Sequence, residues 1–264
     1  MDRTEPVYQF PFGQILTKVE QADKTPKKAF VLGVYASAVH ARWVGKNGKQ
    51  KVSALAVASE PSIFWTGENA DKIISAINLP EQLGVLTVPN DKRLNGPSGR
   101  ALDDLFLEPL HLTRQDTWLC DLLPQSRVNE KQRKAIDTHY NNTIVEQYNL
   151  PKATVPNFDK RELNSQSRRE EILKELELSR ADTLILLGDL PIYWFLRFYG
   201  DKKFTKLSQF GETNDTYGKP HQLKVNGKHY NVIGLCHPRQ ADRLGSSSSK
   251  WGNLHDYWTK NASR

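Results

Sequence analysis

Four short apolar segments, each rich in branched side chains, are spread along the 264-residue chain. Each is too short for a buried helix, and this composition is typical of strands that are covered on both faces. The segments are "AFVLGVY" (29–35), "TWLCDLL" (117–123), "DTLILLGD" (182–189) and "YNVIGLCH" (230–237). Helical patterns lie between them, at 98–110, 129–149, 166–178 and 191–199. Strands that alternate with helices predict an α/β fold with a central, mainly parallel four-stranded sheet covered by helices.

One region departs from this alternation. Asn47 and Gly48 lie between two runs of alternating apolar and polar residues, which is typical of a tight turn between antiparallel strands. We therefore expect an inserted β-hairpin over 41–65. The hydrophobic content of 38% supports a sizeable core, so residues 1–264 are expected to form a single domain with an N-terminal extension at 1–28.

The composition also bears on location and cofactors. No apolar run approaches the ~20 residues that span a bilayer, and the start "MDRTEPVYQF" lacks the layout of a secretory signal. These features predict a cytoplasmic protein with no membrane association. Cys120 and Cys236 are the only cysteines, and both lie in strand-like apolar runs. They are interpreted as buried hydrophobic residues, so no metal site and no cofactor is expected.

The net charge of +7 is unevenly distributed along the chain. Residues 201–264 contain 11 Lys and Arg against 5 Asp and Glu, so most of the excess positive charge lies in this segment. Such a concentration of positive charge favours a partner with a phosphate backbone.

Polar residues stand at the carboxyl ends of the predicted strands, where open parallel sheets bind their ligands. Tyr35, Asp121 and His237 are the main candidates. A lone histidine at a strand end is often structural, and Tyr35 has the alternative of an ordinary aromatic at the edge of the core. Asp121 lies between leucines and a cysteine, where a buried carboxylate is costly unless it has a partner or a function.

The order of five segments resembles the uracil-DNA glycosylase superfamily, particularly the branch with iron–sulfur members. The resemblance extends from about Ala29 to Leu244, and no single segment is diagnostic. The segments are "FVLGVYAS", "NGPSGRALDDLF", "LTRQDTWLCDLLPQSRVN", "DTLILLGDLP" and "VIGLCHPRQADRL".

The resemblance implies a three-layer α/β/α sandwich in which a nucleotide, extruded from single- or double-stranded DNA, enters a crevice at the strand ends. His237 would then donate a hydrogen bond to the departing base, and Tyr35 would occupy the family's catalytic segment. Gly33 and Val34 would line the base pocket. Residues that would contact DNA are Ser98, Arg239, Gln240, Arg243, Leu244, Ser246 and Lys250, with Leu244 or Arg239 as the side chain inserted into the duplex.

The departures from the family pattern concern specificity and catalysis. The first segment has Val34 and Tyr35 where the family has a carboxylate or an amide, and the iron–sulfur cysteines have no counterpart. Asp121 stands where the family has a base-reading Asn. An ionised carboxylate only accepts hydrogen bonds, which suits the adjacent donors of a guanine-type base better than uracil, whereas a protonated one regains a donor. The aromatic that stacks on the base would be Phe64 or Trp65.

Two functions remain open at this point. The chain is either a base-excision DNA N-glycosylase with altered specificity, or a catalytically inactive member of the fold that binds DNA or a nucleotide. The absence of a carboxylate from the first segment favours the inactive protein, whereas Asp121 together with His237 favours the enzyme. A dinucleotide-binding protein is disfavoured because no Gly-rich phosphate-binding pattern follows any strand. In either case a monomer is expected.

Overall fold

The computed structural model describes residues 7–244 and 249–262. Its larger sheet has five strands in the order β5-β1-β6-β8-β7. Four of them are parallel, and β7 pairs antiparallel with β8 at one edge. The bounds are β1 (Ala29–Tyr35), β5 (Thr117–Leu123), β6 (Thr183–Leu187), β7 (His221–Val225) and β8 (Lys228–Leu235). The mainly parallel sheet and the α/β class are therefore as predicted.

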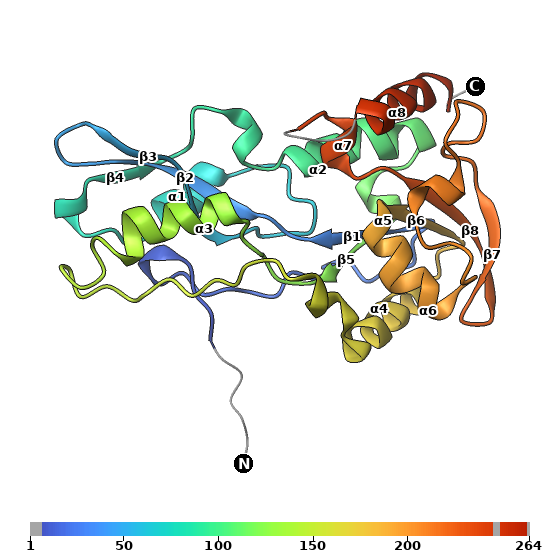
Figure 1. The fold of residues 1–264 in the computed structure, drawn as a ribbon, viewed down its shortest axis with the longest axis horizontal. Coiled ribbons are helices and arrows are strands. Elements are labelled where there is room, and N and C mark those ends of the chain that lie inside the picture. The colour runs from blue at the N-terminus through green and yellow to red at the C-terminus, as the bar shows by residue number, and fades with distance from the viewer. Residues whose placement is uncertain (1–6, 245–248, 263–264) are drawn as a thin grey trace, which may run out of the picture.

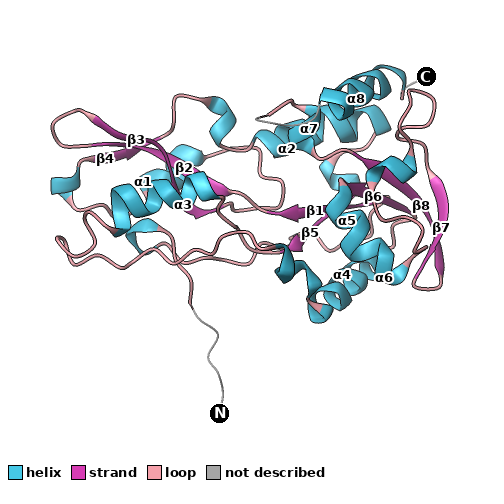
Figure 2. Cartoon of the chain, in the orientation of Figure 1, coloured by secondary structure: helices cyan, strands magenta, loops and turns pink. Residues whose placement is uncertain are grey.

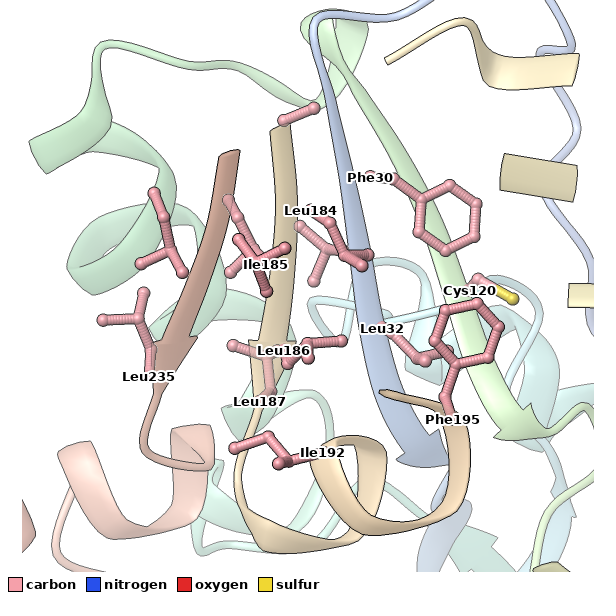
Figure 3. Close-up of a cluster of buried hydrophobic side chains, with 14 of the residues drawn as sticks. Phe30, Leu32, Cys120, Leu184, Ile185, Leu186, Leu187, Ile192, Phe195 and Leu235 are labelled. Atoms are coloured by element: carbon pink, nitrogen blue, oxygen red, sulfur yellow. The ribbon is translucent and has the colours of Figure 1, made fainter. Parts of the chain in front are cut away.

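The parallel strands form because both of their faces are covered. Every residue of β5 is buried, as are all residues of β1 except Tyr35 at its end. Figure 3 shows how Phe30, Leu32, Leu184 and Leu235 come together from three neighbouring strands. With both faces apolar, the strands appear in the sequence as continuous hydrophobic runs rather than as alternating patterns.

Figure 1 draws the helices near this sheet in two groups, one in the upper and one in the lower part of the view. The first group is α2 (Pro97–Leu102), α7 (Pro238–Ala241) and α8 (Ser249–Asn261). The second group is α4 (Gln166–Ser179), α5 (Asp189–Pro191) and α6 (Arg197–Tyr199). In the second group, α4 contacts β5 and β1, and α5 contacts β1 and β6.

A second sheet forms a separate lobe, shown by the magenta strands at the left of Figure 2. It consists of β2 (Ala38–Val44), β3 (Gln50–Ser59) and β4 (Val85–Thr87), all antiparallel. The turn at Asn47 and Gly48 joins β2 to β3, so the predicted hairpin is present. Its first strand begins at Ala38 rather than at 41, and β4 was not predicted. Helices α1 (Ala70–Ser75) and α3 (Glu130–Ile136) complete this lobe.

The lobe has its own hydrophobic core, centred on Trp43, Leu55 and Tyr140. Phe10 and Phe12 from the predicted N-terminal extension are buried in this core. Their aromatic rings contribute directly to its stability, since Phe12 packs edge-on against both Trp43 and Tyr140.

The prediction of a four-stranded sheet is wrong because β7 adds a fifth strand. The segment "HQLKV" alternates polar and apolar residues, and its polar side chains are half-buried or exposed. It therefore lacks the continuous apolar run that identified the other strands. Asn226 and Gly227, both with positive φ, form the turn that pairs β7 with β8.

None of the helices in the described part of the chain is both long and apolar enough to span a bilayer.

Candidate functional site

A cavity of about 580 Å³ lies at the carboxyl ends of the parallel strands and is lined by residues of both lobes. Its volume is in the range of small-ligand sites. Many of the residues singled out from the sequence line it together, although they come from distant parts of the chain. They are Val34, Tyr35, Phe64, Trp65, Ser98, Asp121, His237, Arg239 and Leu244.

The other predicted site residues lie elsewhere. Gly33 is beside Asp121 in the sheet register rather than in the cavity wall. Arg243 is paired with Asp256 at 2.7 Å, and Lys250 with Glu212 at 3.0 Å. Gln240 accepts the backbone N–H of His237 through its Oε1. Ser246 falls outside the described residues.

Asp121 lines the cavity and is 4% exposed. Within the described part of the chain, no group donates a hydrogen bond to its carboxyl oxygens, whereas Arg168 donates to its backbone carbonyl at 2.7 Å. Burial raises the pKa of the carboxyl to about 7, a shift that Arg168 opposes and Glu175 reinforces. At neutral pH both protonation states are thus accessible, and the carboxyl is available to a ligand.

Phe64 and Gly33 shape the space around this carboxyl. A Cβ at Gly33 would lie 2.6 Å from Phe64 Cζ and closer still to Asp121 Oδ1, so only glycine permits this arrangement. Phe64 has a φ of 50°, which is rare for a bulky residue. Arg114 donates to its carbonyl oxygen at 2.6 Å and holds this backbone in place. The ring therefore forms a fixed flat wall beside Asp121.

Two further aromatic residues line the cavity. Tyr35, at the end of β1, stacks on Phe158 with ring centroids 4.7 Å apart, and burial raises the pKa of its hydroxyl. Trp65 is buried and donates its Nε1–H to the carbonyl of Glu68 at 3.0 Å. Tyr35 and Trp65 are therefore engaged by protein groups, whereas the Phe64 ring has no aromatic partner among the described residues.

His237 lies two residues beyond the end of β8, at the N-terminus of α7. Its Nδ1 accepts the backbone N–H of Arg239 at 3.1 Å. Burial, helped by the nearby charge of Arg239, lowers the pKa of the imidazole to about 4. The ring is consequently neutral at physiological pH, with its proton on Nε2, and acts there as a hydrogen-bond donor.

A buried chain of hydrogen bonds fixes the residue before His237. The backbone N–H of Cys236 donates to Tyr217 Oη at 2.9 Å. The Tyr217 hydroxyl donates to His255 Nδ1 at 2.8 Å, and His255 Nε2–H donates to the carbonyl of Leu105 at 2.9 Å. His255, on α8, is 1% exposed, and burial lowers its pKa to about 4. The C-terminal helix thereby holds the segment that carries His237.

Glu60 is a second buried acid in the cavity, and the sequence analysis missed it. It follows β3 directly and is 6% exposed. Burial raises the pKa of its carboxyl to about 8, and the charge of Asp121 adds to the shift, while the backbone N–H of Ser37 opposes it. An acid directly after the apolar run "ALAVAS" is a visible signal, but the turn at Asn47 and Gly48 assigns this run to the hairpin rather than to the parallel sheet, whose strand ends predict the site.

His40 also lines the cavity, but both of its ring nitrogens are occupied. Nδ1–H donates to the carbonyl of Leu94 at 2.9 Å, and Nε2 accepts from the Gln132 amide at 2.7 Å. Burial lowers the pKa of His40 to about 4. This residue therefore joins the walls of the cavity and offers no ring nitrogen to a ligand.

Positive charge surrounds the mouth of the cavity. Arg93, Lys131 and Arg239 line it with exposed side chains, and Arg93 also pairs with Asp91 at 2.9 Å. Arg127 is buried and paired with Glu162 at 2.5 Å. The cavity thus combines a cationic rim with two acids inside, and this distribution suits a ligand with a phosphate outside and hydrogen-bond donors within.

No family model matches the chain, and no curated protein matches it. The functional assignment accordingly depends on the cavity itself. Its decisive feature is that Asp121 and His237, more than 100 residues apart in the sequence, line the same space.

Proposed function

We propose that the chain is a DNA N-glycosylase of the uracil-DNA glycosylase type, with the three-layer α/β/α arrangement of that superfamily. The observation that carries this proposal is the convergence of Asp121 and His237 on one cavity at the ends of the parallel strands. The strand order supports it as well. The four strands predicted from the sequence are adjacent in the sheet, in the order β5-β1-β6-β8. This order places Asp121 and His237 on the two sides of the β1 and β6 ends.

An extruded nucleotide fits the distribution of groups in the cavity. The N-glycosidic bond is inaccessible inside a stacked duplex, so the base must leave the stack. Phe64 offers a flat apolar face for a base at the bottom of the cavity, and the exposed cations at the rim are positioned for the phosphates on either side.

His237 supplies the stabilisation that base release requires. As the glycosidic bond breaks, its electron pair moves onto the base and negative charge accumulates on a ring oxygen. A neutral imidazole whose proton is held on Nε2 donates a hydrogen bond to that oxygen. A donor that is already aimed at the developing charge lowers the barrier without first having to reorganise.

Asp121 sets the base specificity. As an anion it accepts from two adjacent donors, such as the N1–H and amino group of a guanine-type base. When it is protonated it also accommodates an edge with an acceptor next to a donor, as in uracil. Because its pKa is about 7, we expect the choice of base to depend on pH, with donor-rich bases favoured above neutrality.

A panel of oligonucleotides, each with one modified base, tests the proposal. We expect release of at least one base, followed by an alkali-labile abasic site, with guanine-derived lesions that keep the 2-amino group, such as 8-oxoguanine, released faster than uracil at pH 8. A protein that binds the panel but releases no base would instead be the inactive member of the fold. That alternative is favoured by one observation, the Val34 and Tyr35 side chains where the family has a carboxylate or an amide.

The rim predicts where DNA binds. Charge reversal of Arg93, Lys131 and Arg239 should weaken DNA binding for all sequences alike and flatten its dependence on salt, because fewer counterions are released. Fluorescence anisotropy at 50 and 200 mM salt measures both effects. Reversal of Arg243 and Lys250, which lie outside the cavity lining, is the control and should have the smaller effect for each charge reversed. If the control pair had the larger effect, the DNA would lie over α8 rather than over the cavity.

A further inference from the structure

Asp121 and Glu60 are the two carboxylates among the described residues that line the cavity. Asp121 belongs to the wall formed by the parallel strands. Glu60 comes from the other lobe, because it directly follows β3 of the three-stranded sheet. No lysine or arginine in the described part of the chain forms an ion pair with Glu60. A buried, unpaired acid costs stability, so its position at the cavity is better explained by a ligand than by the fold.

Glu60 lies beside the end of β1. Ser59, the last residue of β3, pairs with Ala38, so Glu60 follows this strand pair where β1 leads into β2. In the sheet, β1 lies between β5, which carries Asp121, and β6, whose other neighbour β8 leads to His237. A base that contacts both Asp121 and His237 crosses the end of β1, and Glu60 lines the cavity beside that end.

From this geometry we infer that Glu60 is the catalytic carboxylate of the proposed glycosylase, supplied by the hairpin lobe in place of the first segment. The inference rests on the proposed function. As the C1′–N bond breaks, its electron pair goes to the base and the sugar becomes a cation that the Glu60 anion stabilises. Water then forms the new bond to C1′. One proton of that water passes to Glu60 and is finally transferred to the released base.

The reaction requires the anionic form of Glu60, so its rate should rise with pH. Burial raises the pKa of Glu60 to about 8 and that of Asp121 to about 7, and both groups lose a proton as the pH increases from 6 to 9. The histidines at the cavity are already neutral in this range, and arginine keeps its charge. Ionisable groups at the cavity are Tyr35, His40, Glu60, Arg93, Asp121, Arg127, Lys131, His237 and Arg239.

The variant Glu60→Gln tests the role directly because it keeps the shape and removes the charge. Base release under single-turnover conditions should slow by about 100-fold, and the rise in rate around pH 8 should disappear. Glu68→Gln is the matched control. It changes the net charge by the same amount, but Glu68 is exposed and lies outside the cavity. It should release the base at the rate of the unmodified protein.

Binding gives a second readout that does not depend on turnover. An oligonucleotide with a cationic pyrrolidine in place of the sugar mimics the sugar cation, and one with a neutral tetrahydrofuran has the same shape without charge. We expect the protein to prefer the pyrrolidine by at least 10-fold at pH 8.5, as transition-state mimics are preferred. Glu60→Gln should abolish most of this preference and leave tetrahydrofuran binding unchanged. Glu60→Ala should show the same ratio of pyrrolidine to tetrahydrofuran affinity as Glu60→Gln.

The outcomes separate the two proposals. If Glu60→Gln releases the base at full rate and keeps the pyrrolidine preference, Glu60 is not catalytic and the glycosylase proposal stands. If the unmodified protein releases no base from any member of the panel and shows no pyrrolidine preference, both proposals are wrong. A thermal unfolding curve for each variant confirms that the compared proteins are folded.

Discussion

Replacement of His237 by alanine should slow base release by roughly 10²–10³-fold, the cost of losing one hydrogen-bond donor to a developing oxyanion. The affinity for DNA should change little, because the donor acts on charge that is absent from the ground state. Since the pKa of His237 is lowered to about 4, the ring is neutral throughout pH 6–9. The ratio of the base-release rate of the unmodified protein to that of His237→Ala should therefore stay constant over that range. Single-turnover kinetics with an oligonucleotide that contains the preferred base measure this effect.

His229→Ala is the matched control for this variant. His229 lies on β8, the same strand that leads to His237, but its side chain is exposed and far from the cavity lining. We expect release at the rate of the unmodified protein. Equal rates for His237→Ala and His229→Ala would remove His237 from the mechanism.

Replacement of Asp121 by asparagine should change which base is released. The amide offers a donor beside an acceptor at every pH, so it is complementary to uracil and loses one acceptor for a guanine-type edge. The ratio of kcat/KM for uracil to that for the guanine-type base should increase by roughly 10³-fold, because a mismatched buried hydrogen bond is strongly discriminating. Asp182→Asn, at the opposite end of the sheet, should leave the ratio unchanged.

The same variant has a stability signature that shows whether Asp121 is buried as described. The folded-state pKa of Asp121 is raised from 3.8 to about 7, so the folded protein holds this proton more tightly than the unfolded chain. Stability is then lost as the pH rises from about 4 to about 7, by up to about 4 kcal/mol at 1.36 kcal/mol per pKa unit. Urea unfolding should find Asp121→Asn more stable than the unmodified protein at pH 8, with a smaller difference at pH 5. A pH-independent difference would place the carboxyl in solvent.

Much of the larger sheet could be predicted because its parallel strands are covered on both faces. Burial on both sides leaves a continuous apolar run, and the four such runs correspond to β1, β5, β6 and β8. The convergence of their ends follows from parallel pairing, which brings all the carboxyl ends to one edge. The sequence alone therefore identifies Asp121 and His237 as candidates for the site.

The rest could not be predicted because it depends on contacts between lobes and between side chains. The β4 strand has three residues, and its pairing with β2 is set by the fold of the second lobe. Glu60 enters the cavity only because that lobe packs across the strand ends. The partners of Arg243 and Lys250 are acids 13 and 38 residues away, so neither pairing is visible as a local pattern of charge.

The hydrogen-bond chain from Cys236 through Tyr217 and His255 has a consequence for how the site accepts its ligand. Each ring in the chain has one donor and one acceptor, and both are used, so the chain exists in a single orientation. The loop that carries His237 is thus ordered when the protein folds rather than when a ligand binds. This wall is preorganised, and the entropic cost of arranging it does not reduce the binding affinity. For the proposed glycosylase, we therefore expect conformational adaptation to the extruded nucleotide in the second lobe, whose hydrophobic core includes Trp65.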